Sequence, residues 1–130
     1  MTERVVPMIH VPDVRATARW YESIGFVIRR TNEPDGEMDW AALSFGSTEV
    51  MFSEGGQPSS AHPREVDLYV QTGDVQAVYA RVKDRVEIVE PLHDTFYGMR
   101  EFIIRDPNRV WISFGQPMDR QSSVAEREWS

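Results

Sequence analysis

The sequence predicts an α+β fold made of two tandem β-α-β-β-β modules, and three observations support this. The same order of strand and helix patterns occurs twice, and a segment rich in Gly, Pro and Ser separates the two runs. A shift of 61 positions also places Asp13-Val14 on Asp74-Val75. We therefore expect one domain over residues 1–130, with a first module at about 4–54, a linker at 55–63, a second module at about 64–117 and a polar tail at 118–130.

The first module begins with a β-branched run at 5–11, which Pro7 interrupts, so we expect a short strand near a sheet edge. Asp13 is a favourable N-cap, and Val14, Ala18 and Tyr21 recur at helical spacing until Gly25, which predicts a helix of about three turns. Further strands are predicted at 26–30, 39–45 and 49–53.

The second module repeats this order after the linker. Residues 65–71 alternate as a strand, Asp74 caps a predicted helix at 75–83, and residues 86–89 form the next strand. A loop is expected at 93–98 and a turn at Asp106-Pro107-Asn108. The last two strands are predicted at 100–105 and 110–114.

Composition excludes several classes of function. The chain has no cysteine, which rules out disulfides, thiolate metal sites and cysteine nucleophiles. A net charge of −7 disfavours nucleic-acid binding, because phosphate contacts need clustered Lys and Arg. We find no apolar run of membrane-spanning length, no signal-peptide pattern and no phosphate-binding glycine loop. We therefore expect a cytoplasmic protein without a membrane partner.

Two motifs resemble the vicinal-oxygen-chelate superfamily, which holds glyoxalase I, extradiol dioxygenases, fosfomycin-resistance enzymes and bleomycin-resistance proteins. The first is Val11-Pro12-Asp13-Val14 followed by Trp20-Tyr21-Glu22 and Ile24-Gly25-Phe26. The second is Tyr97-Gly98-Met99-Arg100-Glu101-Phe102 followed by Asp106-Pro107-Asn108-Arg109. Arg109 departs from the usual glycine, and we expect Asn108 to take the left-handed conformation there. The resemblance covers about residues 5–117.

The resemblance implies that the two modules form curved sheets around a cleft, with the helices outside. Strand alternation then assigns the two faces of each strand. The core should receive Val50, Phe52, Val66, Leu68, Val70, Ile112 and Phe114. The other face should carry the candidate ligand-binding residues Met8, Trp40, Glu49, Met51, Glu65, Asp67, Tyr69, Trp111 and Ser113, with Tyr97 beside them in its loop.

The resemblance also implies four metal-ligand positions, which fall on Val6, Met51, Asp67 and Ser113. Only Asp67 among these is an ordinary ligand, and a catalytic divalent ion needs about three. We therefore expect no metal and no cofactor. The alternative is a metal-dependent lyase or dioxygenase with a shifted ligand set drawn from His10, Glu49, Glu65 and Asp67, whereas His62 and His93 are expected at the surface.

Aromatic rings beside Glu49, Glu65 and Asp67 suit a planar or cationic molecule, although any one ring could equally be core. The acidic side chains need solvent, a cation or a basic partner such as Arg29 or Arg100. This pattern resembles the bleomycin-resistance branch, which implies a homodimer that sequesters a bleomycin-like drug without catalysis. The sequence thus favours a binding protein over an enzyme.

Overall fold

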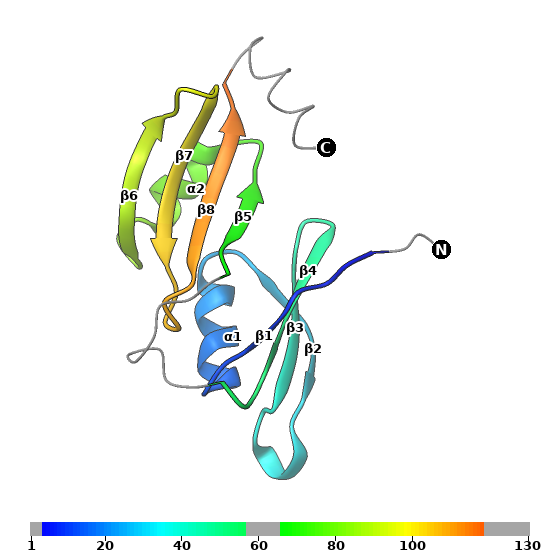
Figure 1. Cartoon of the computed structure of the whole chain (residues 1–130). Coiled ribbons are helices and arrows are strands. Elements are labelled where there is room, and N and C mark those ends of the chain that lie inside the picture. The colour runs from blue at the N-terminus through cyan, green and yellow to red at the C-terminus, as the bar shows by residue number, and fades with distance from the viewer. Residues whose placement is uncertain (1–3, 57–65, 119–130) are drawn as a thin grey trace. The chain divides into compact units, whose positions relative to one another are not determined.

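The computed structural model describes residues 4–56 and 66–118 (Figure 1). The chain divides into two compact units, Met1–Pro63 and Arg64–Ser130. Each unit holds one four-stranded sheet and one α-helix in the order β-α-β-β-β, so the predicted fold class is confirmed.

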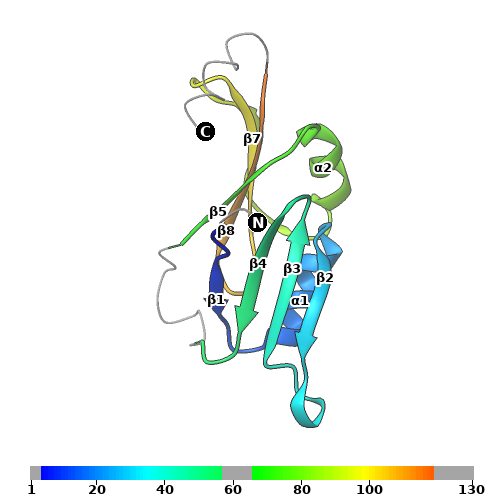
Figure 2. The same cartoon turned by 90° about the vertical axis from the view of Figure 1, so that its right-hand side faces the viewer.

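In the first unit the strands are β1 (Met8–His10), β2 (Val27–Asn32), β3 (Trp40–Phe45) and β4 (Thr48–Ser53), with helix α1 (Val14–Ser23) after β1 and a single 3₁₀ turn at Pro34–Gly36. The sheet order is β1-β4-β3-β2. β1 is parallel to β4, and the other neighbours are antiparallel. Figure 2 shows this sheet with α1 against one face.

The core of the first unit lies between α1 and that sheet. Asp13 caps α1 by accepting a hydrogen bond from the Ala16 amide at 3.0 Å. The fully buried Tyr21 ring meets Phe26 edge-on and lies 4.7 Å, centroid to centroid, from Phe52. The core-facing side of β4 is therefore the Val50 and Phe52 side, as alternation predicts.

The second unit repeats this plan with β5 (Leu68–Gln71), α2 (Val75–Val82), β6 (Glu87–Asp94), β7 (Met99–Arg105) and β8 (Trp111–Pro117). Its sheet order is β5-β8-β7-β6, with β5 parallel to β8. Asp74 caps α2 through the Ala77 amide at 3.0 Å, the same contact that Asp13 makes. Phe102 and Phe114 stack in its core at 5.0 Å.

Three predicted strand limits were wrong in this unit, and the first is the end of β8, which continues to Pro117 instead of ending at Phe114. β6 continues through Pro91 to Asp94, where a loop was expected from residue 93. Because β6 is an edge strand, the missing N–H of Pro91 can face away from the ladder. The register shifts between Ile88 and Glu90 and again between Glu90 and His93, and Pro91 lies in the second shift. β5 begins only at Leu68, which pairs with Ile112, the second residue of β8. Val66 lies before this pairing begins and is 52% exposed instead of buried.

The turn before β8 also differs from the prediction. Arg109, not Asn108, takes the left-handed conformation, with φ of 66°. Asn108 is instead buried, and the carboxylate of Asp106 accepts hydrogen bonds from the amides of Asn108 and Val110 at 2.7 and 2.8 Å. The Asp106 carboxylate holds the backbone of this turn in place, and Arg109 is the residue with the strained backbone conformation.

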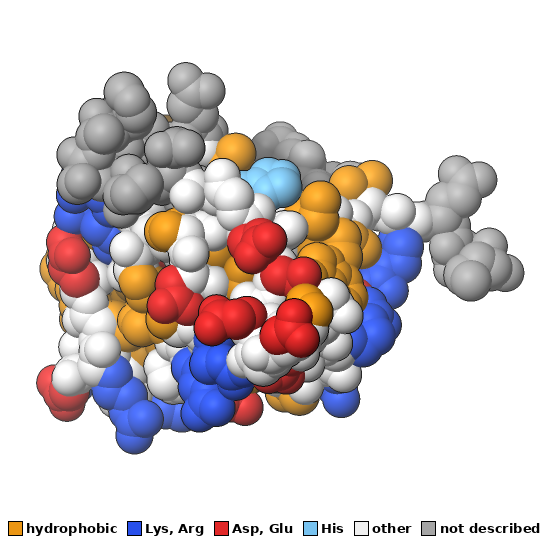
Figure 3. Space-filling view, turned by 90° about the horizontal axis from the view of Figure 1, so that it is seen from below, with side chains coloured by type: hydrophobic (Ala, Val, Ile, Leu, Met, Phe, Trp, Pro, Cys, Tyr) orange, Lys and Arg blue, Asp and Glu red, His pale blue; other side chains and the backbone are white. Residues whose placement is uncertain are grey.

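In the described part of the chain, no helix is long and apolar enough to cross a membrane. On the face shown in Figure 3, acidic and basic side chains lie interspersed.

Candidate ligand-binding face

Each sheet packs its helix on one face, and we call the other the helix-distal face. Strand register places the side chains of this face in rows across neighbouring strands. In the first unit they are Met8, His10, Trp40, Ala42, Ser44, Glu49, Met51 and Ser53. In the second unit they are Tyr69, Gln71, Glu101, Ile103, Arg105, Trp111, Ser113 and Gly115.

In the first unit, a charged cluster forms on this face because β2 contains a bulge. The register shifts between Ile28 and Arg30, so the consecutive Arg29 and Arg30 side chains both reach helix-distal partners. Arg29 Nε donates to Ser44 Oγ at 2.8 Å. Arg30 lies over the Trp40 ring at 5.9 Å and pairs with Glu49 at 3.1 Å.

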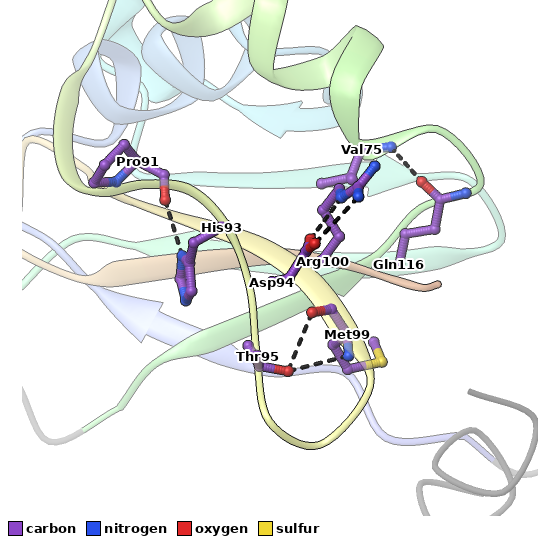
Figure 4. A network of polar contacts seen from close by, with 8 residues as sticks. All are labelled: Val75, Pro91, His93, Asp94, Thr95, Met99, Arg100 and Gln116. Carbon is purple, nitrogen blue, oxygen red and sulfur yellow. Dashed lines mark hydrogen bonds and ion pairs between the residues drawn. The ribbon is translucent and has the colours of Figure 1, made fainter. Parts of the chain in front are cut away.

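This cluster changes the role predicted for Glu49. We expected its acidic side chain to attract a cationic ligand, with Arg29 or Arg100 as possible partners. The partner is Arg30 instead, whereas Arg100 pairs with Asp94 at 2.7 Å (Figure 4). The negative charge of Glu49 is thus already compensated within the first unit.

In the second unit, the helix-distal face centres on Glu101 of β7. Its side chain is buried, with the residue 4% exposed. Tyr69 Oη donates to Oε2 at 2.5 Å, and Tyr97 Oη donates to Oε1 at 2.7 Å. Both carboxylate oxygens are therefore engaged by phenols from separate segments, β5 and the β6–β7 turn.

Local structure brings each phenol to this carboxylate. The β6–β7 turn, which carries Tyr97, is held by Thr95, whose hydroxyl and amide both bond the backbone of Met99 (Figure 4). Tyr69 reaches across β8 at Gly115. A Cβ atom added to Gly115 would lie only 1.9 Å from the Tyr69 hydroxyl oxygen. Only glycine leaves room for the Tyr69 ring there.

The pKa of the Tyr97 phenol is raised to about 12. Burial is the main cause, and the hydrogen bond to Glu101 and the charges of Glu101 and Glu90 act in the same direction. Burial and the hydrogen bond to Glu101 likewise raise the pKa of Tyr69 well above its usual range. Both phenols therefore keep their protons and remain hydrogen-bond donors to Glu101 over the physiological pH range.

Further along the same face, Trp111 and Arg105 are direct cross-strand neighbours. Trp111 is 39% exposed, and Arg105 pairs with Glu87 at 2.6 Å. Ser113 lies beside Tyr69 on the parallel strand pair. The face thus combines an exposed indole, two half-exposed phenols and a buried carboxylate, which suits contacts to a flat molecule with N–H donors.

The remaining candidates from the sequence are more scattered. Met8 and Met51 face each other across the β1–β4 pair, and Trp40 is half-buried beneath Arg30. Asp67 precedes β5 and is exposed, and Glu65 and His62 lie outside the described residues. His93 is half-buried next to Glu101 on the neighbouring strand, with Nδ1 2.9 Å from the Pro91 carbonyl oxygen.

Sequence reasoning did not single out Glu101 as a site residue. Glu101 lies in the second motif, four positions after Tyr97, where it served only as evidence for the family resemblance. The signal that could have identified it was an acidic residue on the same strand face as Met99 and Ile103, because an acidic side chain needs partners when it is buried.

The residues present do not fit a catalytic metal ion. The strand pairs place Met8 beside Met51 and Tyr69 beside Ser113, and none of these four is an ordinary ligand for a divalent ion. His10 lies beside Ser53, with Nδ1 3.1 Å from the Glu54 carbonyl oxygen, whereas Glu49 is bound by Arg30. Among residues 4–56 and 66–118, no group of three His, Asp or Glu side chains is arranged to hold a metal.

Comparison with known families agrees with this architecture. Residues 5–114 match the model of the Glyoxalase/Bleomycin resistance protein/Dioxygenase superfamily. The chain belongs to this superfamily. No curated protein matched the sequence.

Solved structures share the fold. TioX from Micromonospora sp. ML1 aligns with a TM-score of 0.75 at 22% identity, over 90% of this chain and 100% of TioX. A bleomycin-binding protein complexed with bleomycin aligns with a TM-score of 0.69 at 18% identity, over 88% and 98% of the two chains. A bleomycin resistance determinant encoded on the transposon Tn5 gives 0.70 at 19% identity, over 89% and 98%.

Proposed function

We propose that the protein is a metal-independent binding protein that sequesters a small organic molecule, with antibiotic resistance as its outcome. One observation carries the proposal. The helix-distal face of the second unit exposes Trp111, Tyr69 and Tyr97 next to a buried carboxylate, while its β5–β8 pair offers Tyr69 and Ser113 in place of metal ligands. Such a face can bind a molecule, and its described residues include no set of groups for metal-assisted chemistry.

A planar aromatic or cationic drug fits this face best. Each stacking or cation–π contact with Trp111 or a tyrosine is worth roughly 0.5–2 kcal/mol, so three together contribute at most about 6 kcal/mol. Micromolar binding corresponds to about 8 kcal/mol and therefore needs further contacts along the drug. The likeness to two bleomycin-binding or bleomycin-resistance proteins makes a bleomycin-like drug the first compound to test.

The direct test is titration of the purified protein with bleomycin, followed by tryptophan fluorescence and calorimetry. We expect a fluorescence change that saturates with a Kd of about 100 μM or tighter, because three such contacts at the upper end of their range supply about 6 kcal/mol. Trp111→Phe should remove most of the change, while Trp20→Phe, on α1, should leave it intact. A titration without heat or fluorescence change up to millimolar drug would refute bleomycin-like binding.

We further propose that two copies associate as a homodimer. Large apolar side chains stand exposed on the single chain, among them Val5 at 94%, Val66 at 52% and Phe96 at 100%. A second copy would cover those of these groups that lie in its interface, and contiguous exposed apolar surface is typical of interaction sites.

A further inference from the structure

We propose that Glu101 determines which ligands the helix-distal face of the second unit accepts. Acting through the hydroxyls of Tyr69 and Tyr97, it selects a ligand group that carries positive charge and N–H donors, such as an ammonium or guanidinium group. This inference rests on the proposed function and specifies the ligand chemistry of the same face.

The first argument is charge. Glu101 is buried, and within the described residues no Lys or Arg forms an ion pair with it. The arginines that flank it on β7, Arg100 and Arg105, are committed to Asp94 and Glu87. The basic group beside Glu101 on the neighbouring strand is the imidazole of His93, not a Lys or Arg. A buried carboxylate without a Lys or Arg partner is costly, so a cation from a ligand would supply a countercharge.

The second argument is hydrogen bonding. Each phenol has one hydrogen, and both hydrogens are donated to Glu101. The two phenol oxygens therefore meet an incoming ligand as acceptors, strengthened by the carboxylate behind them. Because Tyr69 and Tyr97 are 38% and 42% exposed, a ligand can reach these side chains although Glu101 itself is covered.

The third argument is selectivity. Glu90, a further acidic side chain close enough to act on Tyr97, adds to the negative field at this end of the face. An anionic group would be repelled there, and a neutral group would gain no charge-assisted hydrogen bond. The face thus discriminates by charge as well as by shape.

The test compares two probes of equal shape, 1-naphthylmethylamine and 1-naphthylmethanol, in calorimetric or NMR titrations of the full chain. The wild type should bind the cationic amine about tenfold more tightly than the neutral alcohol, as one charge-assisted hydrogen bond predicts. Glu101→Gln should bring this ratio close to one. Asp84→Asn removes the same charge from an exposed turn and should leave the ratio unchanged.

Gly115→Ala provides a second variant if Glu101→Gln fails to fold. The added methyl would displace the end of the Tyr69 side chain from Glu101, although Tyr69 and Glu101 both remain in the chain. We expect it to lower the amine-to-alcohol ratio as well. The inference is overturned if the ratio is near one in the wild type, or if Glu101→Gln and Asp84→Asn change it equally.

Failure of this inference can be separated from failure of the proposed function. Bleomycin binding that is insensitive to Glu101→Gln would overturn the inference and leave the proposed function standing. An amine preference that depends on Glu101, without any bleomycin binding, would support the inference while the bleomycin-like ligand is abandoned.

Discussion

Burial and the hydrogen bonds that Glu101 accepts from Tyr69 and Tyr97 together raise the pKa of both phenols. The pKa of Tyr97 is raised to about 12, above the ordinary value of about 10. The folded protein thus holds this proton more tightly than the unfolded chain does. The resulting stabilisation is fully present below about pH 10 and is lost as the pH rises towards 12.

Glu101→Gln removes the charge that disfavours the phenolate, so we expect more phenolate at pH 11 than in the wild type. Ultraviolet absorbance of phenolate during a pH titration measures this directly. Asp84→Asn serves as the control and should titrate like the wild type. Coinciding curves for Glu101→Gln and the wild type would contradict the assigned coupling.

Arg109 holds a left-handed conformation that disfavours side chains with a Cβ atom. Arg109→Gly should relieve this strain, and after the entropy cost of glycine we expect a net stabilisation of up to about 1 kcal/mol. Arg109→Ala keeps the Cβ atom and should give no gain. Urea denaturation of the three proteins decides the matter, and equal effects of glycine and alanine would show that backbone strain is not the cause.

At the scale of single elements, α1 and α2 begin with the same aspartate cap. Asp13→Ala should therefore destabilise the protein by about 1 kcal/mol, because one amide at the helix start loses its acceptor. Asp13→Asn should keep most of the stability, since asparagine caps equally well. Thermal unfolding measures both, and an equal loss in the two variants would assign the effect to charge instead of capping.

The helices and most strands could be predicted because their signals are local. Asp13 and Asp74 mark helix starts, and the apolar spacing that follows needs no knowledge of distant residues. The end of β6 could not be predicted in the same way, because Pro91 is compatible with a strand only at a sheet edge. Edge position is a property of the whole sheet.

In the candidate site, too, local patterns could be predicted from the sequence, whereas contacts between distant strands could not. Alternation assigned Tyr69 and Trp111 to the face opposite the helix, where register places them. The link from Tyr69 to Glu101 depends on the absence of a side chain at Gly115, on a different strand. The pairing of Glu49 with Arg30 depends on a bulge that leaves no pattern in the sequence. Ligand contact by any of these residues remains a prediction.

At the scale of the whole molecule, the homodimer can be tested by light scattering. We expect a mass of two chains at micromolar concentration, because association would cover exposed apolar side chains such as Val5 and Phe96. Phe96→Ser should shift the mass towards one chain if the β6–β7 turn lies in the interface. A wild-type mass of one chain across the micromolar range would reject the dimer.

The irregular β2 and β6 strands have a consequence for how copies of this chain can meet. Each is the outer antiparallel edge of its sheet. β2 carries a bulge with two arginines, and β6 has two register shifts, the second of which contains Pro91. Such interruptions obstruct the addition of a foreign strand and so protect against uncontrolled aggregation. The short parallel edges β1 (Met8–His10) and β5 (Leu68–Gln71) contain no bulge or proline, but Pro7 directly precedes β1. Strand addition between copies would therefore be directed to these two edges, and to β5 before β1.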